Sequence, residues 1–178
     1  MGNYKRILRD LKIRMINGEE VFKPIRFVRS KKVKNYLKFI NKNLTDDIIT
    51  GSLALYCYGL MDRNLGDIDI IIDDPNRYEN YDNDHYHINF NLTGRLGYKQ
   101  FKVSNLFGTN EYEVDFFKNE GVKFNSVKLM GCYFRVQPPI DVIENKIKII
   151  LDNNTSFFTN IKHREDVHIV LNKIGYDL

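Results

Sequence analysis

At 178 residues the chain is long enough for one domain with a single core and too short for two comfortable ones, so we expect a single domain over residues 1–178. Hydrophobic residues make up 43% of the chain and charged residues 28%, and no apolar run approaches the roughly 20 residues that cross a bilayer, so the composition excludes a membrane-spanning protein. Two distant cysteines argue against a zinc knuckle or a disulfide framework, the charged first segment lacks the apolar region of a secretory signal, and we expect a cytoplasmic protein.

The net charge of +4 hides an uneven distribution along the chain. Residues 1–45 carry thirteen Lys or Arg against three acids, a local balance of +10, and the remaining residues therefore sum to −6. A basic segment of this strength can steer RNA through phosphate contacts, but it can equally be the solvated face of a helix. Both interpretations stay open at this point.

Two amphipathic helices are predicted in this basic segment. The first extends from about Tyr4 to Met15, where apolar residues recur at helical spacing, and ends near the Asn17-Gly18 turn signal. The second follows Ser30, a suitable N-cap, and covers the sequence KKVKNYLKFINKN. One side of this second helix is basic and consists of Lys31, Lys34, Lys38 and Lys42. We therefore expect residues 1–45 to form a basic helical N-terminal region.

Residues 46–137 have the pattern of a β-sheet core. A short β-branched strand at 48–50 stops at Gly51, a helix begins near Ser52, and a second strand runs from Asp67 to Ile72. After a polar loop, further strands are predicted at 98–107 and 111–117, forming a hairpin across Gly108-Thr109-Asn110, and at roughly 127–136.

Two helices in residues 138–178 complete the predicted fold. Pro138-Pro139 suits the first turn of a helix, and apolar residues recur behind it at helical spacing. The apolar residues that define the two helices are Ile140, Ile143, Ile147 and Ile150, followed by Val167, Val170, Leu171 and Ile174. The chain as a whole thus predicts an α/β (α+β) fold, in which N-terminal and C-terminal helices flank a mixed sheet.

Three acidic residues are the candidate catalytic groups. Asp67 and Asp69 stand two apart on a predicted strand, so their side chains project from the same face with Cα atoms roughly 6.6 Å apart. Asp115 lies in the alternating strand Tyr-Glu-Val-Asp-Phe, on the face opposite the apolar residues. A neighbouring strand would bring this third carboxylate to the same place.

Three clustered carboxylates repel one another and need cations to ionise together in a partly buried site. Oxygen ligands of this kind suit Mg²⁺, or Mn²⁺ in its place, so Asp67, Asp69 and Asp115 are also the expected metal ligands. Two such ions about 4 Å apart promote the in-line transfer of a phosphoryl group from a nucleoside triphosphate (NTP). Asp115 is then the candidate for activating the acceptor hydroxyl.

The NTP phosphates need a binding site as well. Gly51-Ser52 lies where a strand turns into a helix, and there free N–H groups and the Ser52 hydroxyl favour an anion. Arg63 lies shortly before the acids and is a candidate for neutralising triphosphate charge, although a loop arginine is at least as often a surface residue.

The arrangement of these motifs resembles the signature of the DNA polymerase beta-like nucleotidyltransferase superfamily. Gly51-Ser52 is followed by fourteen residues and then by Asp67-Ile68-Asp69, and Asp115 comes in a later strand. The segment GSLALYCYGLMDRNLGDIDI is similar to small bacterial and phage members, including the abortive-infection-type toxin nucleotidyltransferases. The resemblance covers roughly residues 46–172 and implies a nucleotidyltransferase fold and magnesium-dependent nucleotidyl transfer.

Two later segments, PPIDVIENK and KHREDVHIVL, look like further elements of the same family. By that match Lys146, Lys162 and Asp166 would lie near the triphosphate or line the cleft. Judged from the residues alone, Lys146 is as readily a solvated lysine on an amphipathic helix. Residues 70–114 match no defined subfamily, so the acceptor stays open.

The histidines are weaker candidates. His85 and His87 alternate on one face of a possible strand, but with no third ligand at sensible spacing an ordinary hydrogen-bonded or exposed role is favoured over a metal site. His163 is a conceivable base, for which Asp115 is the better candidate.

Three functions follow from these observations. The favoured one is a toxin-like enzyme that adds a nucleoside monophosphate (NMP) to an RNA or tRNA end, for which the basic N-terminal region speaks. The second is the same chemistry on a small molecule or a protein hydroxyl. The third is a nucleotide-binding or antitoxin-like module without turnover, against which the presence of all three acids argues. A cognate antitoxin or a second copy of the chain is the expected protein partner, and no membrane is.

Overall fold

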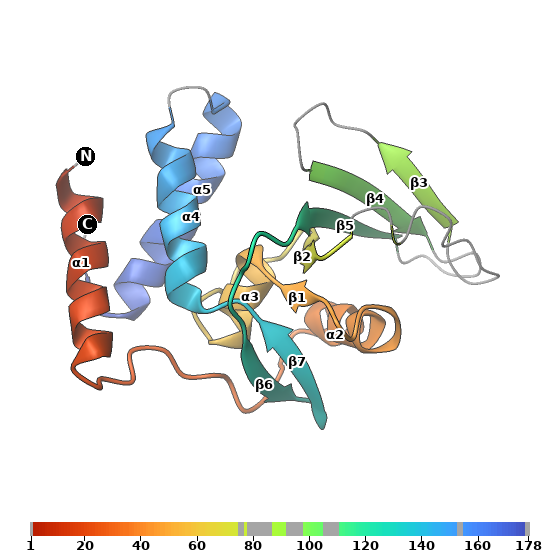
Figure 1. Cartoon of the computed structure of the whole chain (residues 1–178), viewed down its shortest axis with the longest axis horizontal. Helices are drawn as coiled ribbons and strands as arrows, with labels where there is room; N and C mark the ends of the chain where they lie inside the picture. Colours follow the sequence, from red (N-terminus) through yellow and green to blue (C-terminus); the bar gives the residue numbers. More distant parts are fainter. Residues whose placement is uncertain are drawn as a thin grey trace.

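A mixed β-sheet organises the protein in this computed structural model, which describes residues 2–74, 77, 87–91, 98–104, 111–152 and 155–176 (Figure 1). Within these residues the sheet has seven strands in the order β3-β4-β5-β2-β1-β7-β6. Its strands are β1 (Ile48–Ile49), β2 (Ile68–Ile72), β3 (His87–Asn91), β4 (Tyr98–Ser104), β5 (Glu111–Lys118), β6 (Asn125–Leu129) and β7 (Cys132–Val136). Strand β2 pairs in parallel with β5 and antiparallel with β1, which makes the sheet mixed.

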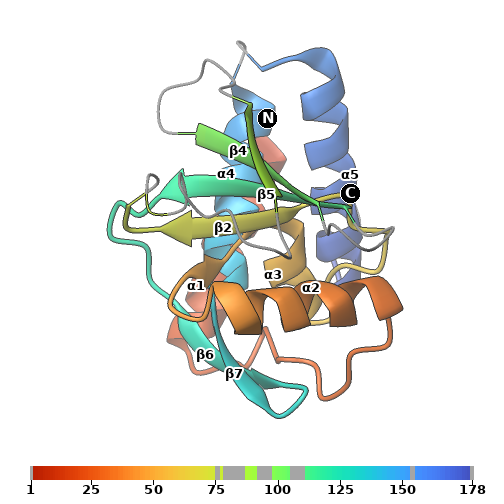
Figure 2. The ribbon, with the colours of Figure 1, turned by 90° about the vertical axis from the view of Figure 1, so that its right-hand side faces the viewer.

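Five helices accompany the sheet in the described part of the chain, and they are α1 (Gly2–Ile16), α2 (Lys31–Asn43), α3 (Gly51–Cys57), α4 (Pro139–Leu151) and α5 (Phe157–Lys173). Helices α4 and α5 stand side by side next to the sheet, with α1 outside them (Figure 1), while α2 runs along the sheet below β2 (Figure 2). The α/β (α+β) class with helices flanking a mixed sheet, expected from the sequence, is therefore confirmed. The division into one domain stays a prediction.

Helix α2 begins where the sequence placed its cap. The Ser30 hydroxyl accepts a hydrogen bond from the Val33 N–H at 3.3 Å, which satisfies one of the free donors of the first turn. The buried side of α2 consists of Val33, Tyr36, Leu37, Phe39 and Ile40 and belongs to the hydrophobic core. The lysines predicted on the other side are exposed.

Helix α3 is shorter than its apolar spacing suggested. In the sequence, apolar residues at helical spacing continue from Leu53 through Leu60 and Met61. The helix nevertheless ends at Cys57, because Gly59 adopts a left-handed backbone with φ +69°. The Gly59 N–H donates to the Tyr56 carbonyl at 2.8 Å and the Leu60 N–H donates to the Leu55 carbonyl at 3.0 Å, which is a Schellman cap.

The strand predicted at roughly 127–136 is in fact a hairpin, and that prediction was wrong. Met130 and Gly131 both have positive φ, 52° and 84°, and form a two-residue turn between β6 and β7. The burial pattern changes parity across the turn, from Val127 and Leu129 to Phe134 and Val136. The sequence carried this signal, because a continuous strand would bury alternate residues without a shift.

The two strands of the other predicted hairpin, at 98–107 and 111–117, are confirmed. β4 and β5 pair antiparallel, with Tyr98 opposite Phe117 and Ser104 opposite Glu111. The predicted turn at residues 108–110 lies outside the described residues, and so does His85. His87 begins β3, a strand of which the structure describes the backbone alone. None of the helices in the described ranges combines the length and apolar character needed to cross a bilayer.

Candidate active site

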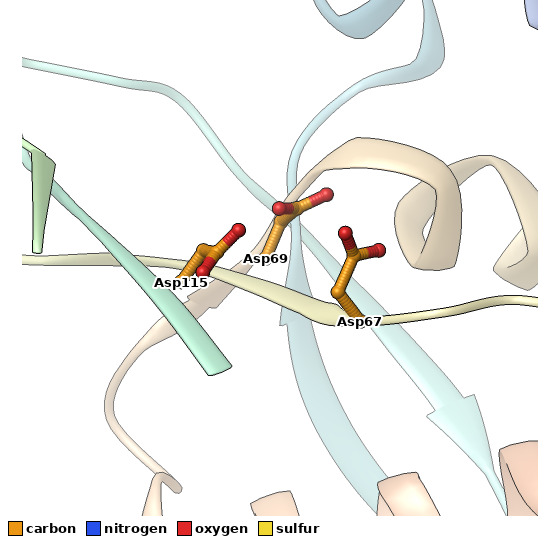
Figure 3. A group of neighbouring side chains, drawn as sticks. All are labelled: Asp67, Asp69 and Asp115. Carbon is orange, nitrogen blue, oxygen red and sulfur yellow. The ribbon is translucent and has the colours of Figure 1, made fainter. Parts of the chain in front are cut away.

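Three carboxylates meet on two neighbouring strands at the centre of the sheet (Figure 3). Asp69 lies in β2 directly opposite Asp115 of β5 in the parallel register, and Asp67 comes one residue before β2 begins. The side chains of all three point toward one another, and one oxygen of each lies within 4.8 Å of the others. The sequence predicted this convergence, with the difference that Asp67 precedes the strand instead of opening it.

The cluster is electrostatically unfavourable without a cation. Burial, followed by the neighbouring carboxylate of Asp67, raises the pKa of Asp69 to about 7, although the Lys146 ammonium acts in the opposite direction. Asp115 is buried as well, at 6% exposure. Three converging hard oxygen donors fit a divalent cation such as Mg²⁺ or Mn²⁺, which would compensate the charges that the fold has brought together.

Gly51 is required where α3 begins. Its φ of +60° lies in the left-handed region, and a Cβ atom built on it would stand 1.8 Å from Oδ2 of Asp69. The Thr50 N–H donates to the Asp69 carbonyl at 3.0 Å, so the turn into α3 is tied to the strand that carries the acid. The start of α3 is thereby held against the carboxylate cluster.

Ser52, the next residue, belongs to a buried polar network centred on Asp166 of α5. The Asp166 carboxylate has no exposed surface and accepts hydrogen bonds from Ser52 Oγ at 3.1 Å and from Lys146 Nζ at 2.8 Å. Arg63 binds both of its oxygens, through Nε at 2.5 Å and Nη2 at 3.0 Å. Burial opposes ionisation of this carboxyl, but the Arg63 hydrogen bonds and the Lys146 charge prevail and lower the pKa of Asp166 to about 2.

His163 adjoins this network from the same helix. Its Nδ1 lies 3.4 Å from Lys146 Nζ. Burial and the neighbouring Lys146 charge lower the pKa of His163 to about 4, so the imidazole is neutral at physiological pH. A neutral ring nitrogen accepts a hydrogen bond from the ammonium, whereas a protonated one would repel it.

A cavity of about 610 Å³ joins the carboxylates to the C-terminal helices. Among the residues that line it are the three acids, Gly51 and Ser52 of α3, Lys146 of α4, and Lys162 and His163 of α5. Lys162 Nζ lies 3.3 Å from Oδ2 of Asp67. The cavity therefore has an acidic wall from the sheet and a basic wall from α4 and α5, which suits a triphosphate with its metal ions.

Of the eight residues proposed from the sequence as catalytic, metal-binding or phosphate-binding groups, seven lie along this cavity: Gly51, Ser52, Asp67, Asp69, Asp115, Lys146 and Lys162. Lys146 is 5% exposed, so its alternative interpretation as a solvated surface lysine does not hold. Arg63 is not among the lining residues, because its guanidinium is bound to Asp166 behind Ser52.

Sequence reasoning missed two features of the site. It expected Asp166 near the triphosphate or in the wall of the cleft, but Asp166 is not among the lining residues and instead binds Ser52, Arg63 and Lys146 behind them. An acid on the buried side of a helix that contains apolar residues at positions 167, 170 and 171 is a signal that it must have cationic partners. Sequence reasoning also passed over Gln137, which lines the cavity and accepts a short hydrogen bond from the Thr50 hydroxyl. Nothing in the local pattern around Gln137 distinguished it.

No family model matches the sequence, and no curated protein matches it. Solved structures do resemble the fold. JHP933 from Helicobacter pylori is 19% identical, with a TM-score of 0.52 over 82% of this chain and 68% of that one. A second H. pylori protein, provisionally assigned as a nucleotidyltransferase, is 18% identical, with a TM-score of 0.51 over 81% and 70%.

An antigenic nucleotidyltransferase-like protein from Paracoccidioides brasiliensis is 12% identical, with a TM-score of 0.53 over 85% of this chain and 79% of that one. At these identities the likeness concerns the fold. The chain therefore shares its fold with these nucleotidyltransferase-like structures, which is the fold that its sequence motifs indicated.

Proposed function

We propose that the protein is a nucleotidyltransferase that moves an NMP from an NTP to an acceptor hydroxyl. The observation that carries this proposal is the convergence of Asp67, Asp69 and Asp115 within 4.8 Å, beside a glycine turn that admits no side chain, in a fold of the nucleotidyltransferase type. A partly buried group of three carboxylates costs stability in the absence of cations, and this cost is typical of a catalytic site.

The three acids are the residues that would hold divalent cations. Bound there, Mg²⁺ or Mn²⁺ would neutralise charge on the reacting phosphates and favour the attack of an oxygen nucleophile. The backbone at Gly51-Ser52 and the Ser52 hydroxyl bind the triphosphate beside the acids, and Lys146 and Lys162 bind it from the opposite wall of the cavity. Asp166 and Arg63 act through these groups, since they hold Lys146 and Ser52 in place.

In the reaction the acceptor oxygen forms a bond to the α-phosphorus as the bond between that phosphorus and the β-phosphate bridging oxygen breaks. Pyrophosphate leaves, and Asp115 accepts the proton of the acceptor hydroxyl. Lys162 neutralises the leaving pyrophosphate, which requires its ammonium to move from Asp67 toward the phosphates. The favoured acceptor is an RNA end, such as that of tRNA, which the balance of +10 in residues 1–45 supports.

The test is transfer of label from each of the four α-labelled NTPs, with Mg²⁺, into total RNA and into cell extract. Wild type is compared with Asp67→Asn/Asp69→Asn and with the control Asp73→Asn/Asp74→Asn, which removes two exposed acids just after β2. We expect labelled RNA with wild type and control and a loss of at least about a hundredfold in the catalytic variant. Label in a small molecule or a protein would change the acceptor, and no label with any NTP would contradict the proposed activity.

A further inference from the structure

The connection between α1 and α2 presents an unusual group of side chains on the surface. It runs along the bottom of the molecule in Figure 1 and contains the sequence Arg26-Phe27-Val28-Arg29. Val28 is 7% exposed and anchors the segment in the core, whereas Phe27 is 81% exposed. Arg26 and Arg29 are exposed too and make no ion pair within the described ranges.

The side chains of Arg26, Phe27 and Arg29 border a second cavity, of about 370 Å³. Its other walls include Tyr56 from α3 and the ion pair of Lys173, at the end of α5, with Asp62, whose Nζ and Oδ2 atoms are 3.0 Å apart. The second cavity lies at the end of α3 that is opposite Gly51, and the seven residues of this helix extend over about 10 Å. It is therefore separate from the candidate active site, and its residues can be changed without touching that site.

The basic side of α2 continues from this cavity. The Ser30 N–H donates to the Tyr56 hydroxyl at 3.2 Å, which fixes the start of α2 beside the cavity wall. From there the exposed Lys31, Lys34 and Lys38 follow one another on the same side of the helix, about 4.5 Å and 6 Å apart along its axis. α2 contains no acidic residue, so this row of charges is not neutralised within the helix.

Charge and aromatic character together distinguish the kinds of partner. Lysine is depleted in protein–protein interfaces, whereas three of the charged groups here are lysines on one helix face. An exposed aromatic ring beside arginines, next to a basic track, is the arrangement that holds unpaired nucleobases and their backbone. The surface thus favours a single-stranded nucleic acid over an acidic protein.

We propose that Arg26, Phe27 and Arg29, together with the lysine row of α2, form a binding surface for single-stranded RNA. A base stacks on Phe27, the two arginines contact the adjacent phosphates, and Lys31, Lys34 and Lys38 follow the backbone along α2. This inference rests on the proposed function in one respect, namely that the bound RNA is the acceptor. Binding to the surface itself is measured without turnover.

The experiment measures fluorescence anisotropy of a labelled single-stranded oligouridine RNA against protein concentration at several salt concentrations. We expect Arg26→Gln/Arg29→Gln to weaken binding at least about tenfold and to reduce the slope of log K against log salt by about 1.4, as two lost phosphate contacts require. Phe27→Ala should weaken binding about five- to a hundredfold with an unchanged salt slope. Thermal unfolding verifies that each variant is folded.

The matched control is Lys5→Gln/Arg9→Gln, which removes the same charge from the exposed side of α1. Equal weakening in this control would show a net-charge effect only and would overturn the proposal, as would unchanged binding in all three variants. Competition by polyglutamate as strong as that by unlabelled RNA would assign the surface to an acidic protein instead.

The two proposals can fail separately. RNA binding that depends on Phe27 and the arginines, without label transfer from any NTP, would leave this inference standing and contradict the proposed activity. Conversely, the Arg26→Gln/Arg29→Gln variant could transfer label into RNA as well as wild type does at low RNA concentration. That result would leave the proposed activity standing and contradict this inference.

Discussion

Gly51 brings the backbone at the start of α3 against the carboxylate of Asp69. The left-handed φ of +60° costs an L-residue roughly 1–2 kcal/mol. The steric conflict is the larger problem, since the position of an added Cβ is occupied by the carboxylate itself. Any side chain at position 51 must therefore displace Asp69 from the cluster or move α3 away from it.

Gly51→Ala should reduce nucleotidyl transfer at least about a hundredfold, because a catalytic carboxylate displaced by an ångström loses its alignment. The protein should still fold, with its free energy of unfolding lowered by about 1–3 kcal/mol. Activity and chemical denaturation are the two measurements. Gly66→Ala is the matched control, since nothing lies within 4 Å of a Cβ at that position. Equal activities of the two variants would contradict the steric argument.

His163 should make the stability of the protein depend on pH. Its pKa is lowered from 6.5 to about 4 in the fold, so the unfolded chain gains a proton first as the pH falls. The contribution of this group is complete above pH 6.5 and is lost between about pH 6.5 and pH 4, to the extent of roughly 1–3 kcal/mol.

The measurement compares the free energy of unfolding of wild type and His163→Gln between pH 8 and pH 4. We expect the advantage of wild type to shrink steadily below about pH 6.5 and to vanish or reverse near pH 4. Because Asp69 titrates in an overlapping range, the difference between the two profiles is the relevant quantity. A difference that stays constant with pH would show that His163 titrates normally in the fold.

Helix α2, which packs on the sheet below β2 (Figure 2), contacts the loop that leads into the candidate active site. Its Tyr36 is 2% exposed, and the hydroxyl donates to the carbonyls of Leu65 and Gly66, at 3.4 Å and 3.2 Å. These carbonyls belong to the loop that ends at Asp67. The helix therefore holds the chain in position immediately before Asp67, the first carboxylate of the cluster.

Tyr36→Phe keeps the ring in the core and removes only this tether. We expect a loss of about 1–2 kcal/mol in the free energy of unfolding, because the buried carbonyl of Leu65 and the part-buried carbonyl of Gly66 lose their donor. Transfer activity should fall about three- to thirtyfold at saturating NTP as Asp67 becomes less well placed. Tyr133→Phe, an exposed tyrosine on β7, serves as the control. Unchanged activity in Tyr36→Phe would show that the loop is held by other contacts.

Periodicity and spacing were sufficient to predict most elements and the acidic cluster. The alternation around Asp115 and the two-residue step from Asp67 to Asp69 fix which strand faces carry the acids, and the parallel pairing of β2 with β5 then places them together. The β6–β7 turn was missed because Met130 is an uncommon residue at positive φ. The partners of Asp166 could not be predicted, since Ser52, Arg63 and Lys146 are far from it in sequence and meet it only in the folded chain.

The acidic and the basic residues of the protein are concentrated in different regions, and each region corresponds to one of the two proposed functions. The acids that the sequence concentrates after residue 45 include the three on the sheet, and the basic N-terminal region supplies the surface around α2. The carboxylate cluster is a source of instability in the folded state, because burial and mutual repulsion act on it only there. Divalent cations that bind the cluster should reverse this effect, since they bind the folded state and not the unfolded chain.

Without divalent cations, Asp69→Asn should therefore be at least as stable as wild type, with a gain of up to about 2 kcal/mol at pH 8. Added Mn²⁺ or Mg²⁺ should stabilise wild type progressively, by about 2.7 kcal/mol at a hundred times Kd, and leave Asp69→Asn nearly unchanged. Thermal unfolding at increasing cation concentration measures both effects, with Asp73→Asn/Asp74→Asn as the variant that should respond like wild type. If all three proteins respond equally to the cation, it binds elsewhere, and the acidic cluster loses its proposed role as the metal site.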